Sequence, residues 1–343
     1  MYGDENIQNA RRGIIEAIDL RIGYSDNDHF PEISAQVCES EFIVLLGRNG
    51  VGKSTLLKTL AGLQTSFGGV LNLMGRPVNR YKQSRRAELV SYVSTERIKV
   101  RDMTVADLVA LGRYSHTDWL GKPSEEDKLH INNALLAAGV ARLAKKNVNA
   151  LSDGELQRCM IARTLAQDTP LIILDEPTAF LDLPNKIEIM HILSNLSSEK
   201  GKTIVMSTHD LDLAMRMADK LWIMSAAGLT EGAPEDLALN EGLNDLFAET
   251  GFYFDYSRGI VAHNNSEEQS ITFDGENENL KFWLAKALKR VGFNPIESSY
   301  HPLIKTVNKG GKLEFEYRNG EQNVAFGSIY ELAIFLKNTK RKI

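Results

Sequence analysis

A glycine-rich segment between an apolar run and a helical pattern is the strongest chemical signal in the sequence. The segment Gly47-Arg-Asn-Gly-Val-Gly-Lys-Ser-Thr55 has the spacing G-x-x-x-x-G-K-S. Glycines let backbone N–H groups approach phosphate oxygens, Lys53 reaches the β and γ phosphates, and the Ser54 hydroxyl can bind magnesium. These properties predict a nucleotide site with a strand before the loop and a helix after it. The predicted ATP-binding positions are Gly47, Asn49, Gly50, Gly52, Lys53, Ser54 and Thr55.

Two neighbouring acids end a second buried-strand pattern, Leu171-Ile-Ile-Leu-Asp-Glu176. Open α/β sheets bind their ligands at the carboxyl ends of the strands. Asp175 suits magnesium and Glu176 suits a water molecule, although an apolar strand that ends in two acids is, by itself, more often structural. Together with the phosphate loop, the acids predict ATP and Mg²⁺ as the ligands.

A third motif, Leu151-Ser-Asp-Gly-Glu-Leu-Gln-Arg158, lies between the first two, and the order of the three resembles the ABC ATPase family. Taken alone, Ser-Asp-Gly-Glu is a helix cap. In that family the phosphate loop of one subunit and this signature segment of its partner enclose each ATP, so the resemblance implies a homodimer. Ser152 and the backbone of Gly154 would then lie at a helix start, where unpaired N–H groups favour an anionic phosphate.

Three further positions match the family. Tyr24 resembles the aromatic residue that stacks on adenine, with an ordinary surface tyrosine as the alternative. Asp182 resembles the acid that couples the two sites across the dimer, with a turn cap as the alternative. His209 resembles the switch histidine that contacts the γ-phosphate, so the resemblance assigns catalysis to Glu176, His209 and Lys53.

The sequence departs from the family at two sites. The family has a glutamine after Tyr-Val-Pro, whereas this chain has Tyr92-Val-Ser-Thr-Glu-Arg97, so either Thr95 or Glu96 is a candidate oxygen ligand for magnesium. In the signature, Asp153 replaces a glycine and Glu155 a glutamine, which places two acids near an anionic nucleotide. We therefore expect weak or partner-dependent hydrolysis.

The fold class indicated by the apolar patterns is α/β. Short apolar runs that suit buried strands are Ile14–Arg21, Phe42–Leu46, Leu171–Leu174 and Thr203–Met206. A helical pattern from Thr104 to about Val140 indicates an insertion. We expect an ABC nucleotide-binding domain over residues 1–257, with a P-loop core and a helical subdomain at about 96–165.

A small α+β accessory domain is predicted over residues 258–343, after the polar run Asn264–Ser270. Its signals are an apolar helical stripe from Leu280 to Val291, alternation over Leu313–Tyr317, an Asn319-Gly320 hairpin, and a Ser328/Glu331 capping box. Two interpretations remain open for it: a packing domain that steadies the dimer, which we favour, or a regulatory domain that senses a ligand or partner.

The segment Thr104-Val-Ala-Asp-Leu-Val-Ala-Leu-Gly-Arg-Tyr-Ser-His116 resembles the permease-docking region of ATPases that serve importers of siderophores, haem and cobalamin. The alternative is a plain amphipathic helix with Thr104 as its cap. The resemblance implies transmembrane permease subunits as partners and an extracytoplasmic substrate-binding protein in the same system. It favours an iron complex as cargo, with cobalamin second.

Composition narrows the possible locations and partners. The chain has 343 residues, 43% hydrophobic and 25% charged, with no apolar run near the twenty residues that a membrane helix needs. Its acidic start lacks a signal or transit pattern, so we expect a cytoplasmic protein, peripheral on the inner face of the cell membrane through the permease. Cys38 and Cys159 have no metal-ligand spacing, and a net charge of −5 argues against nucleic acid.

Two other classes of function compete with transport. A soluble ABC ATPase of cofactor assembly or repair needs no permease; the absence of a long coiled-coil pattern argues against repair, and the Thr104–His116 segment argues against cofactor assembly. A non-hydrolysing regulatory subunit draws support only from the altered motifs. Retention of Lys53, Asp175, Glu176 and His209 favours turnover.

Overall fold

A computed structural model of the chain describes residues 12–24, 30–94, 102–116, 123–248, 250–256, 259–263, 269–275, 277–296, 302–309, 311–320 and 322–340. The chain forms two compact units, Met1–Val261 and Ala262–Ile343. The sequence placed this boundary four residues earlier, after residue 257. Each unit is described by itself.

The first unit is built on a six-stranded sheet with the order β10-β9-β3-β8-β7-β6. Its strands are β3 (Phe42–Gly47), β6 (Val90–Val93), β7 (Leu171–Leu174), β8 (Thr203–Ser207), β9 (Lys220–Ser225) and β10 (Gly228–Gly232). All neighbours are parallel except β9 and β10. Strands β3, β7 and β8 are buried along their whole length, which explains their unbroken apolar sequences. The carboxyl ends of β3, β7 and β8 therefore share one edge.

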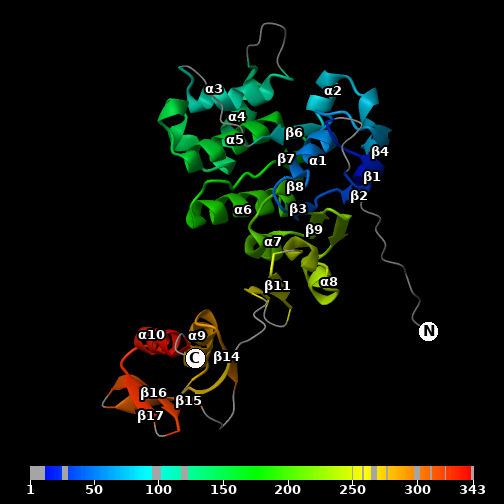
Figure 1. Ribbon diagram of the computed structural model, residues 1–343. Helices are drawn as coiled ribbons and strands as arrows, with labels where there is room; N and C mark the ends of the chain where they lie inside the picture. The colour runs from blue at the N-terminus through cyan, green and yellow to red at the C-terminus, as the bar shows by residue number, and fades with distance from the viewer. Residues whose placement is uncertain are drawn as a thin grey trace, which may run out of the picture. The chain divides into compact units, whose positions relative to one another are not determined.

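A four-stranded sheet, β2-β1-β4-β5, lies beside this core. It consists of β1 (Gly13–Arg21), β2 (Ile33–Cys38), β4 (Gly68–Leu73) and β5 (Arg76–Pro77). Helix α1 (Lys53–Leu60) follows β3, and its leucines pack in one cluster with side chains from both sheets. This packing fixes the position of α1, which begins directly after the phosphate loop (Figure 1).

A helical subdomain adjoins the sheet. It contains α3 (Val105–Ala110), α4 (Glu125–Ala137) and α5 (Asp153–Gln167), and α5 packs against both of the others. Figure 1 shows these helices as a group apart from α1 and β4. The remaining α-helices of this unit are α2 (Gln83–Ala87), α6 (Leu183–Ser198), α7 (Leu211–Met217) and α8 (Pro234–Leu239). A two-stranded sheet of β11 (Phe252–Asp255) and β12 (Ile260–His263) follows, and β12 crosses the boundary after Val261.

A buried ion pair ties the helical subdomain together. Arg113 Nε donates to Asp127 Oδ1 at 2.7 Å, and Arg113 Nη1 donates to the Ala166 carbonyl at 3.0 Å. Both charged side chains are only 6% exposed. The hydrogen bond from Arg113 lowers the pKa of Asp127 to about 2, so the carboxylate stays charged. Arg113 is therefore internal to the subdomain, although the sequence placed it in a partner-recognition segment.

Other residues of the Thr104–His116 segment also serve the fold. Thr104 caps α3 in a reciprocal box with Asp107, and a Cβ on Gly112 would lie 2.1 Å from the Arg163 carbonyl, so the chain there packs closely on α5. Leu111 and Tyr114 are the large apolar side chains of this segment that are exposed, at 48% and 78%. The structure thus confirms Thr104 as the cap of an amphipathic helix, while docking of this segment on a permease stays a prediction.

The second unit is an α+β domain, as predicted. Its sheet has the order β14-β13-β15-β16-β17, and α9 and α10 pack together against it. The elements are β13 (Gln269–Asp274), α9 (Glu278–Arg290), β14 (Phe293–Ile296), β15 (Leu303–Lys309), β16 (Lys312–Asn319), β17 (Gln322–Phe326) and α10 (Ile329–Lys340). Apolar side chains from the sheet and both helices form its core, including Ile271, Ile304, Leu284 and Leu336.

Candidate active site

The phosphate loop joins the carboxyl end of β3 to the start of α1. Gly50 and Gly52 have φ angles of +81° and +105°, which side chains other than glycine rarely adopt. A Cβ on Gly50 would meet no atom within 4 Å, so the loop is open on that side. Ser54 and Thr55 follow in the first turn of α1, where free backbone N–H groups favour an anion. This is the geometry that a phosphate-binding loop requires.

Lys53 lies across this loop. Its Nζ donates to the carbonyls of Gly47 at 2.8 Å and Arg48 at 3.1 Å, and the residue is only 6% exposed. Burial lowers the pKa of Lys53, while the negative charges of Glu176 and Asp175 oppose that shift. The lysine thus has replaceable backbone acceptors and two acids nearby, so phosphate oxygens can take the place of the carbonyls.

Asp175 stands at the carboxyl end of β7 and is held by a hydroxyl from the next strand. Ser207 Oγ donates to Asp175 Oδ1 at 2.8 Å and accepts from the backbone N–H of Glu176 at 2.9 Å. Ser207 is fully buried. The hydroxyl of Tyr92, on β6, lies 3.4 Å from the other carboxylate oxygen of Asp175. Ser207 therefore fixes the first acid relative to the second.

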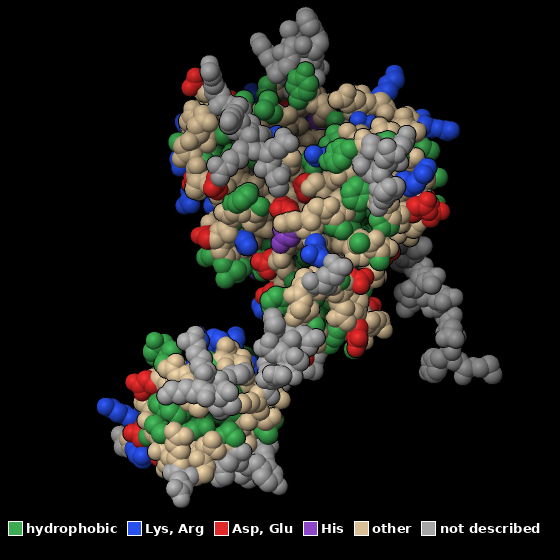
Figure 2. Space-filling model, viewed as in Figure 1, with side chains coloured by type: hydrophobic (Ala, Val, Ile, Leu, Met, Phe, Trp, Pro, Cys, Tyr) green, Lys and Arg blue, Asp and Glu red, His purple; other side chains and the backbone are tan. Residues whose placement is uncertain are grey.

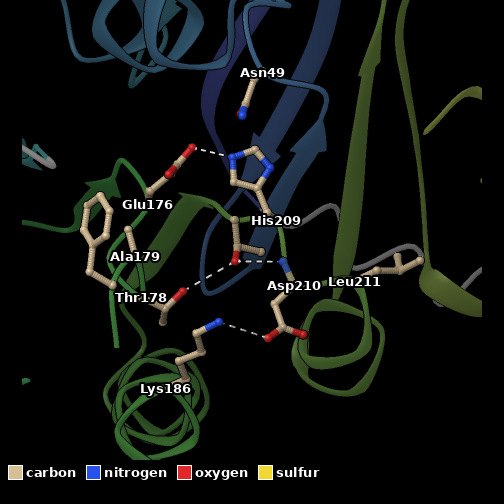
Figure 3. Close-up of a pocket in the computed structure, with 10 residues that line it drawn as sticks. Asn49, Glu176, Thr178, Ala179, Lys186, His209, Asp210 and Leu211 are labelled. Carbon is tan, nitrogen blue, oxygen red and sulfur yellow. Dashed lines mark hydrogen bonds and ion pairs between the residues drawn. The ribbon is translucent and has the colours of Figure 1, made fainter. Parts of the chain in front are cut away.

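Glu176 and His209 face each other across the mouth of the site. His209 Nε2 lies 2.7 Å from Glu176 Oε1, and both side chains are partly exposed. Figure 3 shows the two side chains directed toward each other, with Asn49 of the phosphate loop above the histidine in this view. Glu176 has a φ of 48°, a strained backbone conformation that typically persists where the surrounding structure enforces it. The site is arranged to hold a carboxylate at a solvent-accessible position.

A second set of polar contacts lies below this pair in Figure 3. Thr178 and Thr208 hydroxyls are 3.4 Å apart, Thr208 Oγ1 accepts from the Asp210 N–H at 3.2 Å, and Lys186 Nζ is 3.6 Å from Asp210 Oδ2. These contacts join the segments after β7 and β8 to α6. Sequence reasoning gave no role to these residues or to Ser207, although all of them lie within a few residues of the predicted motifs.

The signature segment begins α5. Ser152 is the N-cap: its Oγ accepts from the Glu155 N–H at 3.2 Å, and Glu155 Oε2 accepts from the Ser152 N–H at 2.9 Å. A Cβ on Gly154 would lie 2.9 Å from the side chain of Asn185, and Asp182, the N-cap of α6, accepts from the N–H of that asparagine. Asp182 therefore does act as a cap, and the start of the signature helix lies against Asn185, in the first turn of α6.

The remaining predicted residues lie at the edges of the site or outside the described chain. Tyr24 is 72% exposed, and its hydroxyl accepts from Thr55 Oγ1 at 3.4 Å, which leaves its ring accessible. Thr95 and Glu96, the candidate magnesium ligands of the altered loop, lie outside the described residues. On the face seen in Figure 2, acidic, basic and histidine side chains lie close together.

The donors present suit magnesium. Magnesium prefers oxygen ligands and is held by one or two carboxylates together with substrate phosphates and water. Asp175 supplies a carboxylate at the end of β7, and Ser54 supplies a hydroxyl at the start of α1. Within the described ranges, no group of three or more His, Cys, Asp and Glu side chains could hold a metal by itself.

The phosphate loop with its lysine follows β3, two acids follow β7, and a histidine follows β8, the strand between them. Together these groups define a P-loop nucleotide-hydrolysing protein. Residues 30–179 match the family model described as ABC transporter, and residues 268–337 match the model described as Iron ABC transporter C-terminal domain.

Similar proteins agree with these matches. The achromobactin transport ATP-binding protein CbrD of Dickeya dadantii is 38% identical, over 70% of this chain and 88% of its own length. The ferric enterobactin transport ATP-binding protein FepC of Escherichia coli is 34% identical, over 66% and 84%. A solved dimeric structure, the bacterial ABC transporter cassette MJ0796, superposes with a TM-score of 0.57 at 25% identity, over 64% of this chain and 99% of that one. The chain therefore belongs to the ABC transporter family of ATP-binding proteins and is an ATPase of that family.

Proposed function

We propose that this chain powers the import of an iron complex, a siderophore or haem, through separate permease subunits. The observation that carries the proposal is the match of residues 268–337 to the iron ABC transporter C-terminal domain. That match is independent of the ATPase motifs, which all ABC ATPases share. The named functions of CbrD and FepC, which concern siderophores, support the same cargo class. Cobalamin is the second candidate.

In the proposed cycle two copies of the chain close over two ATP molecules. The phosphate loop of one copy binds the triphosphate, and Ser152 and Gly154 of the other present the start of α5 to the γ-phosphate. Tyr24 stacks on adenine, and Asp182 lies between the two sites. The dimeric structure of the cassette MJ0796 supports the assembly of two copies.

The chemistry needs positioned charge rather than a covalent intermediate. Glu176 orients the attacking water and accepts its proton, while His209, 2.7 Å from that carboxylate, holds Glu176 and contacts the γ-phosphate. Lys53 exchanges its carbonyl acceptors for phosphate oxygens and stabilises the charge that spreads onto them. Magnesium, held by Asp175 and Ser54, neutralises further phosphate charge when bound.

The exposed side chains Leu111 and Tyr114 are the proposed contact with the permease, because the neighbouring residues of that segment are occupied within the helical subdomain. No helix in the described parts of the chain is both long and apolar enough to cross a membrane. We place the chain in the cytoplasm, at the inner face of the membrane through the permease, with an extracytoplasmic binding protein delivering the cargo.

The test is reconstitution. The chain is co-expressed with a candidate permease, placed in lipid, and assayed for ATP hydrolysis and for uptake of a ferric siderophore, haem or cobalamin in the presence of the matching binding protein. ATP-dependent uptake of an iron complex that is lost in Glu176→Gln supports the proposal. Uptake of cobalamin but of no iron complex would identify cobalamin as the cargo. Full hydrolysis without any association with a permease would support the soluble ATPase instead.

A further inference from the structure

An acidic side chain lies at the helix start that the proposed function directs at ATP. Glu155 occupies the signature position at which a glutamine is usual in the ABC ATPase family that the segment resembles. Its Oε2 accepts from the Ser152 N–H at 2.9 Å, so the carboxylate is turned back onto the very residue that meets the γ-phosphate. A glutamine could make the same cap without the charge. The substitution therefore places a negative charge beside an anionic ligand.

The same carboxylate oxygen has a cationic partner. Lys146 Nζ donates to Glu155 Oε2 at 3.1 Å, from the turn that precedes the signature. Hydrogen bonds from the Ser152 N–H and from Lys146 lower the pKa of Glu155, so it is anionic at neutral pH. The two side chains are 40% and 20% exposed, and a pair this open to water contributes little to folding stability. Its larger effect is on local charge.

The backbone of Lys146 is fixed on both sides. Its N–H donates to the Leu143 carbonyl at 2.8 Å, and its carbonyl accepts from the Val105 N–H at 3.0 Å, at the start of α3. The lysine is thus anchored to the helical subdomain independently of the signature. Its ammonium group is therefore held near Glu155, with less conformational entropy to lose than that of a lysine on a free loop.

We propose that Lys146 is a positioning residue of the composite ATP site: it neutralises Glu155 so that the start of α5 can accept the γ-phosphate bound by the partner subunit. This inference rests on the proposed closure of two copies over ATP. If Lys146 neutralises Glu155 in this way, Glu155 by itself gives no reason for weak hydrolysis, and the expectation of weak or partner-dependent hydrolysis stays a prediction.

The test compares Lys146→Met with Lys145→Met in the full chain. Both changes remove one positive charge and keep an aliphatic side chain; Lys145 is the exposed neighbour and makes no ion pair with Glu155 among the described contacts. The readouts are the ATP concentration for half-maximal hydrolysis and for dimer formation in a Glu176→Gln background. One unit charge at roughly 8 Å in a water-like dielectric changes the affinity about two- to threefold for each phosphate charge. We therefore expect Lys146→Met, but not Lys145→Met, to raise the ATP concentration for half-maximal hydrolysis and dimer formation by about three- to tenfold.

The decisive measurement repeats Lys146→Met in a Glu155→Gln background. The effect of Lys146→Met should disappear there, and in the native background it should shrink as salt is raised. Binding of a fluorescent ATP analogue to the monomer's own phosphate loop should not change, and neither should the melting temperature.

Two outcomes would overturn the inference. One is no difference between Lys146→Met and Lys145→Met. The other is a defect that persists in the Glu155→Gln background, which would mean that Lys146 acts on the nucleotide itself or on the fold. Both are distinguishable from failure of the proposed function, in which the native chain would show no ATP-driven dimer.

Discussion

Replacement of Ser207 by alanine should weaken magnesium-dependent hydrolysis far more than it weakens the fold. The Ser207 hydroxyl is fully buried and joins Asp175 Oδ1 to the Glu176 N–H, at 2.8 and 2.9 Å. Its removal frees the carboxylate to rotate and leaves one buried N–H without its acceptor. Loss of a hydrogen bond that orients a metal ligand typically costs about 10- to 100-fold in metal affinity or activity. We expect a rise of that size in the magnesium concentration for half-maximal ATP hydrolysis.

The matched control is Ser91→Ala. Ser91 is also buried, on β6, which lies beyond β7 in the same sheet, and its hydroxyl accepts from Thr169 Oγ1 at 3.0 Å. The Ser91→Ala change removes the same hydroxyl group from the same sheet without removing a contact to either acid. The magnesium dependence of this variant should therefore match that of the native chain. If Ser207→Ala and Ser91→Ala show equal magnesium dependence, Ser207 has no role in positioning Asp175.

Three further predictions concern buried groups of the fold. Asp127→Asn should destabilise the chain by about 3–5 kcal/mol in denaturant unfolding because it leaves Arg113 buried without its partner, and a loss under 1 kcal/mol would contradict this. The pKa of Asp127 falls from 3.8 to about 2 on folding, so the carboxylate's contribution is complete above pH about 4 and is lost as pH falls through about 2; melting curves over that range would test it. Burial raises the pKa of the Cys159 thiol to about 12, so a thiol reagent at neutral pH should modify Cys38 first, and equal labelling rates would refute the expectation.

The sequence predicted the strands and the helix that carry the phosphate loop and the two acids, because local signals agreed there. The spacing of Gly47–Ser54 and the apolar runs before it and before Asp175 are properties of short segments, and the rule for carboxyl ends of parallel strands brings such segments together. Ser207 was missed because a serine at a strand end is common. Only the register of β7 and β8 puts its hydroxyl beside both acids.

Other parts of the fold depended on contacts between distant segments. Strand β2 alternates buried and exposed side chains, and it gave no apolar run in the sequence. In the second unit, the stripe of α9 and the hairpin of β16 and β17 were visible, whereas β13, β14 and β15 are stabilised by pairing that no short window contains. Arg113 shows the same limit: its burial depends on Asp127, fourteen residues away.

The most direct test of the central claim, a composite ATP site with Glu176 as its base, is the behaviour of Glu176→Gln in ATP and magnesium. The account predicts hydrolysis reduced at least about 100-fold, together with a stable dimer that retains two ATP molecules and dissociates when ATP is removed. A dimer that forms equally well in ADP, or hydrolysis at the native rate, would contradict it.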